Sequence, residues 1–205
     1  METLFQAYRA LFGKGDALYQ LFSPYRICPL GAHVDHQHGL VSGFAFDKGI
    51  EFLFSATDMG KVEMCSLSFE GLMTFNVQKP IEEKQNNWGG AVWALQQDFQ
   101  LKKGVKGVVQ GSMPIGGVSS SAALLCGFVM AIAKVNEIEL DKMQVIHYAS
   151  EAEREYVGLR NGILDQACVV LCEADKLLYL DTKTSEYKLL PFGNGEKKEL
   201  PFELG

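Results

Sequence analysis

The chain has 205 residues, 47% of them hydrophobic, and a formal net charge of −6 at pH 7. A chain of this length normally forms one domain, and this apolar fraction is ample for a core. The acidic balance argues against nucleic acid as a partner, because no basic stripe is available to offset phosphate charge. No apolar run approaches the length that crosses a bilayer, so we expect no membrane partner either.

The cysteines are odd in number, and no two of them form a CxxC pair. This pattern is typical of reduced thiols that pack mainly in a core. The segment from Met1 to Ala10 lacks the apolar stretch of a signal peptide. We therefore expect a soluble, cytoplasmic protein. The cysteines are Cys28, Cys65, Cys126, Cys168 and Cys172.

The first half of the chain is predicted to open with a helix and continue in strands. Apolar residues at helical spacing predict a helix over 1–12, closed by Gly13. A polar loop rich in His and Asp is expected over 30–38. The triplet Asp58-Met59-Gly60 lies between two strand-like runs and predicts a hairpin there. The predicted strands are 17–28, 48–57, 61–67 and 72–77.

The second half is predicted to be mainly helical. The segment 121–136 is apolar nearly all round, which indicates a buried helix, and Asp141 is a helix cap. Strands first and helices later, with few βαβ alternations, predict an α+β fold. The predicted helices are 88–101, 121–136, 141–156 and 163–172, with a strand at 107–110 and a closing hairpin at 177–180 and 187–190.

The last residues differ in composition from the rest of the chain. Residues 193–205 are rich in Gly, Glu, Lys and Pro and contain no predicted element. We expect residues 1–192 to form one domain and 193–205 to be a linker toward a further domain.

A glycine turn that runs into three hydroxyls lies before the long apolar helix. Its sequence is Pro114-Ile115-Gly116-Gly117-Val118-Ser119-Ser120-Ser121. Glycines allow a ligand to approach the backbone, and the helix start presents unpaired N–H groups. This arrangement is suited to phosphate oxygens, and it is not a Walker motif because no Lys follows the glycines.

A carboxylate closes the second notable motif, Gly162-Ile163-Leu164-Asp165-Gln166. Asp165 could take a proton from an attacking hydroxyl, as phosphoryl transfer requires. The plainer interpretation is an Asp that caps the following helix.

Histidines and an acid crowd the loop before the second strand. His33, Asp35, His36 and His38 have the short spacing that can bind a transition metal. A metal-binding module is therefore one alternative for the function of this chain.

These motifs resemble those of the GHMP small-molecule kinases, and within them the galactokinase branch. The segment Ser23–His36 is similar to the galactokinase signature PGRVNLIGEHTDY, and Gly162–Gln166 is similar to GIMDQ. The glycine-serine turn resembles the ATP loop of the superfamily. The resemblance implies an α+β fold with a mixed sheet packed against helices, the N-terminal domain of such kinases, whose members carry a second, C-terminal domain.

The resemblance also implies roles for individual residues. Asp165 corresponds to the catalytic base, and Arg26 to an arginine between base and phosphoryl group that offsets charge. His33, Asp35 and Gly162 correspond to sugar contacts. ATP would be held by the turn, and Mg²⁺ by one hydroxyl and one carboxylate. The expected phosphate contacts are Gly116, Gly117, Ser119, Ser120 and Ser121, and the expected Mg²⁺ contacts are Ser121 and Glu153.

One departure from the galactokinase pattern bears on the substrate. Ala32 occupies the position of a Glu that, in the family, bonds the 6-hydroxyl of the sugar. A Glu there would repel a carboxylate at carbon 6, by about 4 kcal/mol at about 4 Å and an effective dielectric near 20. Residues 23–36, together with residues 158–166, resemble the galacturonokinase variant of the family. We therefore expect galacturonate to be favoured over galactose. Arg160, where the family has Pro, is our candidate partner for the carboxylate.

Other departures leave a second hypothesis open. The glycine turn is one residue shorter than the family form P-x-G-x-G-L-S-S-S, which could weaken nucleotide binding. Tyr25 replaces a Gly beside Arg26, either reshaping the sugar pocket or packing in the core. A catalytically silent sugar-binding or regulatory relative is the alternative to a kinase.

Overall fold

The computed structural model describes residues 2–81, 87–113, 117–159 and 161–191. One long strand, β2 (Leu40–Thr57), is the centre of a seven-stranded mixed sheet. Strand β1 (Tyr19–Leu30) pairs antiparallel with one edge of β2 along most of its length. The other edge of β2 is divided, since its second half pairs with β5 (Gly104–Gly111) and its first four residues pair with β6 (Lys176–Asp181).

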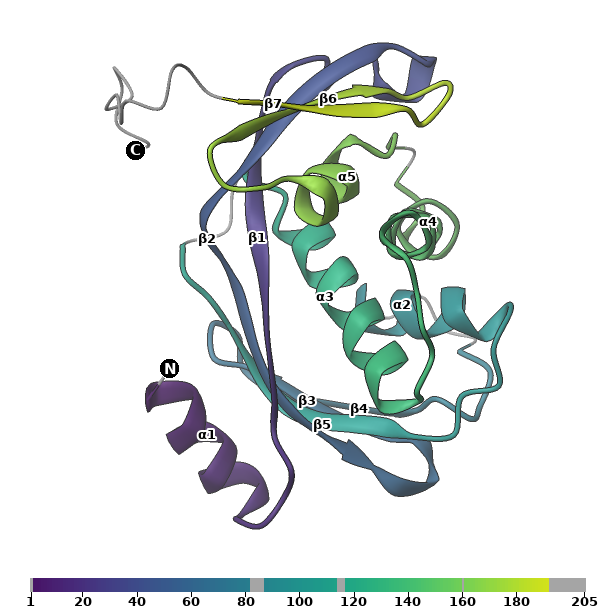
Figure 1. Ribbon diagram of the computed structural model, residues 1–205. Helices are drawn as coiled ribbons and strands as arrows, with labels where there is room; N and C mark the ends of the chain where they lie inside the picture. The colour runs from purple at the N-terminus through teal and green to yellow at the C-terminus, as the bar shows by residue number, and fades with distance from the viewer. Residues whose placement is uncertain (1, 82–86, 114–116, 160, 192–205) are drawn as a thin grey trace.

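The remaining strands extend the sheet at its two ends. Strand β3 (Lys61–Ser66) runs parallel to β5, and β4 (Leu72–Asn76) pairs antiparallel with β3. Strand β7 (Tyr187–Pro191) pairs antiparallel with β6, which confirms the predicted closing hairpin. Figure 1 shows the two ends of the sheet joined by the long β1–β2 ribbon.

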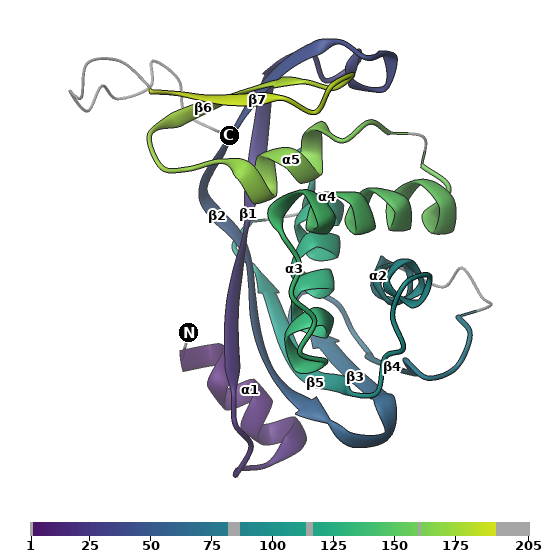
Figure 2. The same ribbon diagram turned by 45° about the vertical axis from the view of Figure 1, so that its right-hand side comes forward.

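Most of the helices cover one face of this sheet, as the two ribbon views show (Figures 1 and 2). The buried helix α3 lies against β1 and β2, and its neighbours pack around it. Trp88, Phe52 and Phe128 join helices and sheet, with ring centroids 6.5 Å and 4.9 Å from that of the indole. The helices on this face are α2 (Asn87–Gln96), α3 (Ser120–Val135), α4 (Lys142–Glu151) and α5 (Leu164–Leu171).

Helix α1 (Glu2–Phe12) lies on the opposite face, where Leu4 and Tyr8 pack against the sheet. The helix ends as predicted, with Gly13 at φ +83° and its N–H bonded to the Arg9 carbonyl at 3.0 Å. The Tyr8 hydroxyl bonds Asp16 Oδ2 at 2.9 Å and Ser55 Oγ at 2.7 Å. Helix α1 is thus joined to β2 by a buried polar contact as well as by apolar packing.

The α+β prediction is confirmed, but the predicted hairpin at Asp58-Met59-Gly60 is wrong. The strands on either side of this turn exist, yet β5 lies between them in the sheet. Strand β5 is apolar on both faces, with Val105, Val108 and Val109 buried, and such a strand is stable only in the interior of a sheet. A turn signal is local and cannot reveal that a distant strand is inserted.

Two boundaries also differ from the prediction. Strand β2 begins at Leu40, eight residues before the predicted start at Lys48. Helix α2 ends at Gln96, not at Leu101, because the next N–H groups bond carbonyls three residues back and tighten the last turn. Helix 141–156 is divided into α4 and a π-helical turn, Ala152–Val157, with Asp141 capping the start as predicted.

We expect Tyr8→Phe to lower the free energy of unfolding by about 1–2 kcal/mol, because the buried Ser55 hydroxyl loses its partner. Urea unfolding measures this change. The matched control is Tyr19→Phe, since Tyr19 is 37% exposed. Equal stability of the two variants would contradict a contribution from the Tyr8 hydrogen bonds.

Candidate active site

The site is built where β1 and α5 converge, and it centres on a bidentate ion pair. Arg26 Nε lies 2.6 Å from Asp165 Oδ1, and Arg26 Nη2 lies 2.7 Å from Asp165 Oδ2. Two parallel hydrogen bonds fix the plane of the carboxylate relative to the guanidinium. Asp165 does not cap α5, whose N-cap is Ile163, so the plainer interpretation of this residue is wrong.

The ion pair is largely buried but remains partly accessible to solvent. The side chains of Arg26 and Asp165 are 15% and 23% exposed. Burial lowers the pKa of Arg26, but the hydrogen bonds and charge of Asp165 outweigh it and leave this pKa raised. The guanidinium therefore remains a fixed positive charge beside the carboxylate.

The glycine-serine turn closes over the same pair. Arg26 Nη1 donates to the carbonyl of Gly117 at 3.2 Å, and the Arg26 backbone N–H donates to that of Val118 at 3.4 Å. Ser119 is left-handed at φ 53°, and its hydroxyl donates to Asp165 Oδ2. Because Ser119 is used in this way, its side chain does not cap α3. The N-terminus of α3 thus faces the site without a side-chain cap, as an anion site requires.

A second carboxylate, that of Glu153, lies against the first turn of α3. Glu153 is 3% exposed and accepts hydrogen bonds from Ser121 Oγ at 2.9 Å and from Gln166 Nε2 at 2.7 Å. Glu153 belongs to the π-helical turn, a distortion that is frequent at functional sites. A hydroxyl and a carboxylate are hard oxygen donors, so the chemistry of Ser121 and Glu153 is compatible with Mg²⁺. Their role as Mg²⁺ contacts stays a prediction.

Gln166 was not among the predicted site residues. It is fully buried, and its carbonyl oxygen has no partner among the described residues. Its amide nitrogen holds the Glu153 oxygen that Ser121 does not contact. The motif at 162–166 contained this residue, but nothing in its spacing indicated a contact with Glu153.

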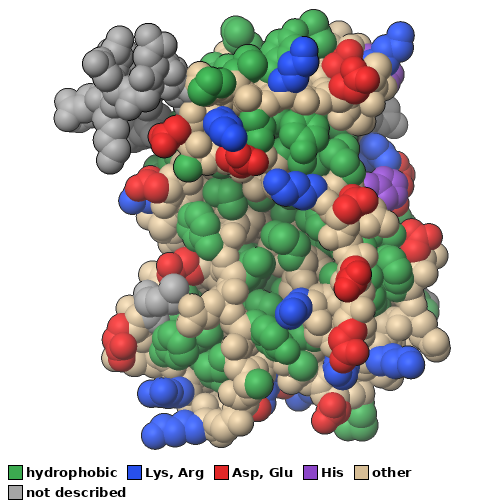
Figure 3. Space-filling model, viewed as in Figure 1, with side chains coloured by type: hydrophobic (Ala, Val, Ile, Leu, Met, Phe, Trp, Pro, Cys, Tyr) green, Lys and Arg blue, Asp and Glu red, His purple; other side chains and the backbone are tan. Residues whose placement is uncertain are grey.

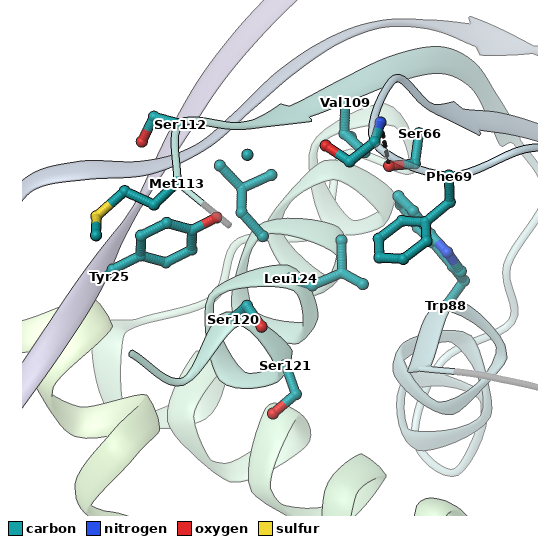
Figure 4. A pocket seen from close by; sticks show the side chains of 13 residues that line it. Tyr25, Ser66, Phe69, Trp88, Val109, Ser112, Met113, Ser120, Ser121 and Leu124 are labelled. Atoms are coloured by element: carbon teal, nitrogen blue, oxygen red, sulfur yellow. Dashed lines mark hydrogen bonds between the residues drawn. The ribbon is translucent and has the colours of Figure 1, made fainter. Parts of the chain in front are cut away.

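A cavity of about 860 Å³ opens beside the start of α3. Figure 4 shows the Trp88 and Phe69 rings on one side, Tyr25 on the other, and Ser120 and Ser121 below. Tyr25 is 2% exposed and belongs to the main core, so it packs beside this cavity and not on the Asp35 side. Phe69 and Trp88 were missed because single aromatic residues in a sequence carry no signal of a pocket.

Two of the residues expected to bind sugar, Asp35 and Gly162, lie together at the start of α5. Asp35 Oδ2 accepts from the Leu164 N–H at 3.4 Å, at the start of α5. A Cβ on Gly162 would lie 2.4 Å from Asp35 Cγ, so this position requires glycine. Ala32 and His33 are exposed on the loop before β2. A cavity of about 730 Å³ is lined in part by Asp35, His36, His38 and Gly162.

Some predictions lie outside the described residues. These are the phosphate contact at Gly116, the carboxylate partner Arg160 and the linker at 193–205. In the described ranges, no three His, Cys, Asp or Glu side chains are arranged to hold a metal ion. None of the helices described is long and apolar enough to cross a membrane. On the face in Figure 3, acidic and basic side chains are interspersed among hydrophobic ones.

A family model for the N-terminal domain of GHMP kinases matches residues 86–173. The chain is 38% identical over 205 residues to a galacturonokinase of Arabidopsis thaliana, with 89% of this chain and 48% of the relative covered. A galactokinase of Thermococcus kodakarensis is 33% identical over 178 residues, with 84% of this chain and 50% of the relative covered. The chain thus spans about half the length of these curated relatives.

Solved structures agree with the sequence comparison. The crystal structure of Lactococcus lactis galactokinase complexed with galactose superposes with a TM-score of 0.85 at 25% identity, covering 91% of this chain and 50% of that one. Methanococcus jannaschii mevalonate kinase shares the fold, with a TM-score of 0.68 at 16% identity over 85% of this chain and 55% of its own. The chain belongs to the GHMP kinase superfamily. Within it, the chain falls in the galactokinase branch, as the motifs predicted.

We expect Gln166→Glu to lower the free energy of unfolding by about 3 kcal/mol or more at neutral pH, because a second buried carboxylate would replace the donor to Glu153. The loss should shrink as the pH falls, since a protonated carboxyl can donate again. Urea unfolding at several pH values measures it. Gln97→Glu, on an exposed position, is the matched control. A stable, pH-insensitive Gln166→Glu protein would show that this contact does not hold Glu153.

Proposed function

We propose that this chain is the part of an ATP- and Mg²⁺-dependent sugar-1-kinase that holds the phosphates and the catalytic pair. The observation that carries the proposal is the contact of Arg26 and Asp165 with the turn that leads into α3. A base candidate, a fixed positive charge and a helix N-terminus meet at one place, which is what phosphoryl transfer to a hydroxyl needs.

Two features beside the start of α3, the glycine-serine turn and the larger cavity, support nucleotide binding. Gly116, Gly117, Ser119, Ser120 and Ser121 would surround the phosphates, where the helix dipole favours negative charge. The cavity beside them has aromatic and aliphatic walls with serine hydroxyls, and it is large enough for a purine base. Ser121 and Glu153 would hold Mg²⁺, which offsets phosphate charge when it is bound.

Chemistry would occur where Asp165 faces the sugar. The anomeric hydroxyl of the sugar would attack the γ-phosphorus in line, and its proton would pass to the Asp165 carboxylate. The bond from the γ-phosphorus to the bridging oxygen would break, with ADP as the leaving group. Arg26 would stabilise the negative charge that develops on the transferring oxygens. Ser119 and Gly117 hold the pair in place, so the geometry is set before substrate binds.

A galactose-type sugar is the proposed acceptor, with galacturonate favoured over galactose. His33, Asp35 and Gly162 would line the sugar site, with Ala32 at the position facing carbon 6. The absence of a Glu at position 32 removes a charge that would repel a carboxylate, and Arg160 would attract one. The 38% identity to a galacturonokinase supports this preference.

We further propose that residues 1–192 act as the N-terminal domain of such a kinase, followed by a linker at 193–205. The support is that the chain matches about half the length of each curated relative. A C-terminal domain would then complete the cleft.

We expect Asp165→Asn to reduce kcat by about 10²- to 10⁴-fold, because the amide cannot take the proton. ADP release from ATP and galacturonate by the intact protein measures the change. Asp58→Asn is the control, since Asp58 is exposed in the turn after β2, at the end of that strand remote from Ala45, the partner of Arg26. A kcat for Asp165→Asn close to that of the control would refute Asp165 as the base.

We expect galacturonate to have the higher kcat/KM of the two sugars, and Ala32→Glu to shift the preference toward galactose. The shift should lie between about 5-fold, for a solvent-screened charge, and about 10³-fold, for a shielded one. Ala32→Gln adds the same bulk without charge and is the control. Better use of galactose by the unaltered protein, or equal shifts in both variants, would contradict the charge argument.

A further inference from the structure

Three cysteines gather directly beside the ion pair, and the proposed reaction uses none of them. The Sγ atoms of Cys28 and Cys168 lie 3.9 Å apart, although 140 residues separate them in sequence. The Cys172 thiol also interacts with that of Cys168 and lies 3.8 Å from the Gly43 carbonyl oxygen. Of these, Cys168 is buried, while Cys28 and Cys172 are half-buried.

The register of β1 and α5 explains why two of the thiols meet. Cys28 follows Arg26 by two residues and lies on the same side of β1, and Cys168 follows Asp165 by three on the same side of α5. Cys28 Sγ also lies 3.9 Å from Asp165 Oδ1. The thiol pair is therefore a second contact between the two elements that carry the ion pair.

The backbone of β2 holds these thiols together. A Cβ at Gly43 would lie 2.3 Å from Cys168 Sγ and 3.3 Å from Cys28 Sγ. Both sulfur atoms therefore pack against the backbone of Gly43, which places them at the same point of β2.

We propose that Cys28 and Cys168 are an oxidation site, at which a peroxide forms a disulfide between β1 and α5. The Cys28 thiol loses its proton, and its thiolate attacks one peroxide oxygen. The O–O bond breaks, the leaving hydroxide takes up that proton as water, and a sulfenic acid remains on Cys28. Cys168 sulfur then attacks the sulfenic sulfur, the S–O bond breaks, and the leaving hydroxide takes the Cys168 proton as water. Two thiols lose two electrons, and the peroxide gains them.

Solvent access and geometry favour a disulfide between Cys28 and Cys168 over one between Cys168 and Cys172. The half-buried Cys28 can meet a small oxidant, and Cys168 is within reach to resolve the sulfenic acid. Hydrogen bonds to Cys172 and Cys28, together with burial, raise the pKa of Cys168, so it suits the second step better than the first. Cys172 is the C-cap of α5, one turn beyond Cys168, and its N–H bonds the Cys168 carbonyl at 3.4 Å. At this spacing Cβ atoms are about 5–6 Å apart, farther than a disulfide allows.

The disulfide would alter the ion pair next to it. An S–S bond of about 2.05 Å requires the sulfur atoms to approach by nearly 2 Å from their present separation. This movement pulls the Cys28 sulfur from Asp165 and shifts α5 against β1. Displacements of about 1 Å near reacting atoms can cost about 10²-fold in rate. The loss of activity rests on the proposed function, whereas formation of the disulfide does not.

The test is oxidation of the purified chain with hydrogen peroxide, followed by peptide mass mapping without reductant. We expect a cross-linked peptide containing Cys28 and Cys168, a mass loss of about 2 Da, and reversal by dithiothreitol. Cys28→Ser should abolish the cross-link, while the control Cys65→Ser should retain it, since Cys65 lies on β3. Cys168→Ala is the second variant and should also abolish the cross-link. Alanine is used because Cys168 is buried and serine would place a hydroxyl there, and circular dichroism checks that the variant folds.

A cross-link between Cys168 and Cys172, or sulfinic acid at Cys28 without any cross-link, would overturn the proposal. If the intact protein phosphorylates sugar, oxidation should lower kcat by about tenfold or more, and Cys28→Ser should be resistant. A disulfide that forms without a change in kcat would refute the effect on the ion pair and leave the oxidation site standing.

Discussion

The bidentate contact between Arg26 and Asp165 is the interaction on which the site depends. It joins the start of the sheet to helix α5, across 139 residues of sequence. The same guanidinium holds the Gly117 carbonyl, and the same carboxylate accepts from Ser119. Strand, helix and turn are therefore positioned by one pair of side chains, and the start of α3 is positioned with them.

The long strand β2 makes this convergence possible. One half of β2 supports β5, which leads into the glycine-serine turn, and the other half supports β6, which follows α5. Strand β1 lies along the opposite edge and carries Arg26 between the two halves. All three parts of the site are thus attached to one strand, and Gly43 in that strand lets α5 pack closely enough for contact.

Glu153, Ser121 and Gln166 form a second polar cluster, separate from the ion pair. The proposed metal site and the proposed base are therefore assigned to different carboxylates. Glu153 is held by Ser121 and Gln166 and contacts neither member of the ion pair. The start of α3 contacts both carboxylates through different hydroxyls, since Ser119 donates to Asp165 and Ser121 donates to Glu153. Both clusters stand on helices buried against the sheet, which gives the site a rigid support.

Much of this could be predicted from residues close together in sequence. The helix at α1, the capping Asp141 and the hairpin of β6 and β7 follow from periodicity and turn chemistry. The motifs around Arg26, Ser119 and Asp165 predicted the family, and the structure brings these three side chains into contact. The predicted hairpin was wrong because it depended on long-range pairing, and the turn at 58–60 gave no sign that β5 would lie between its strands.

The sequence by itself determined the fold class and the family, because short motifs identify the family and the order of strand-like and helix-like segments indicates α+β. Only the tertiary structure decided which side chains are in contact. It placed Gln166 on Glu153, Tyr25 beside the larger cavity and Cys28 against Cys168. These contacts join residues remote in sequence, and they depend on the packing of whole helices on the sheet, which no local pattern specifies.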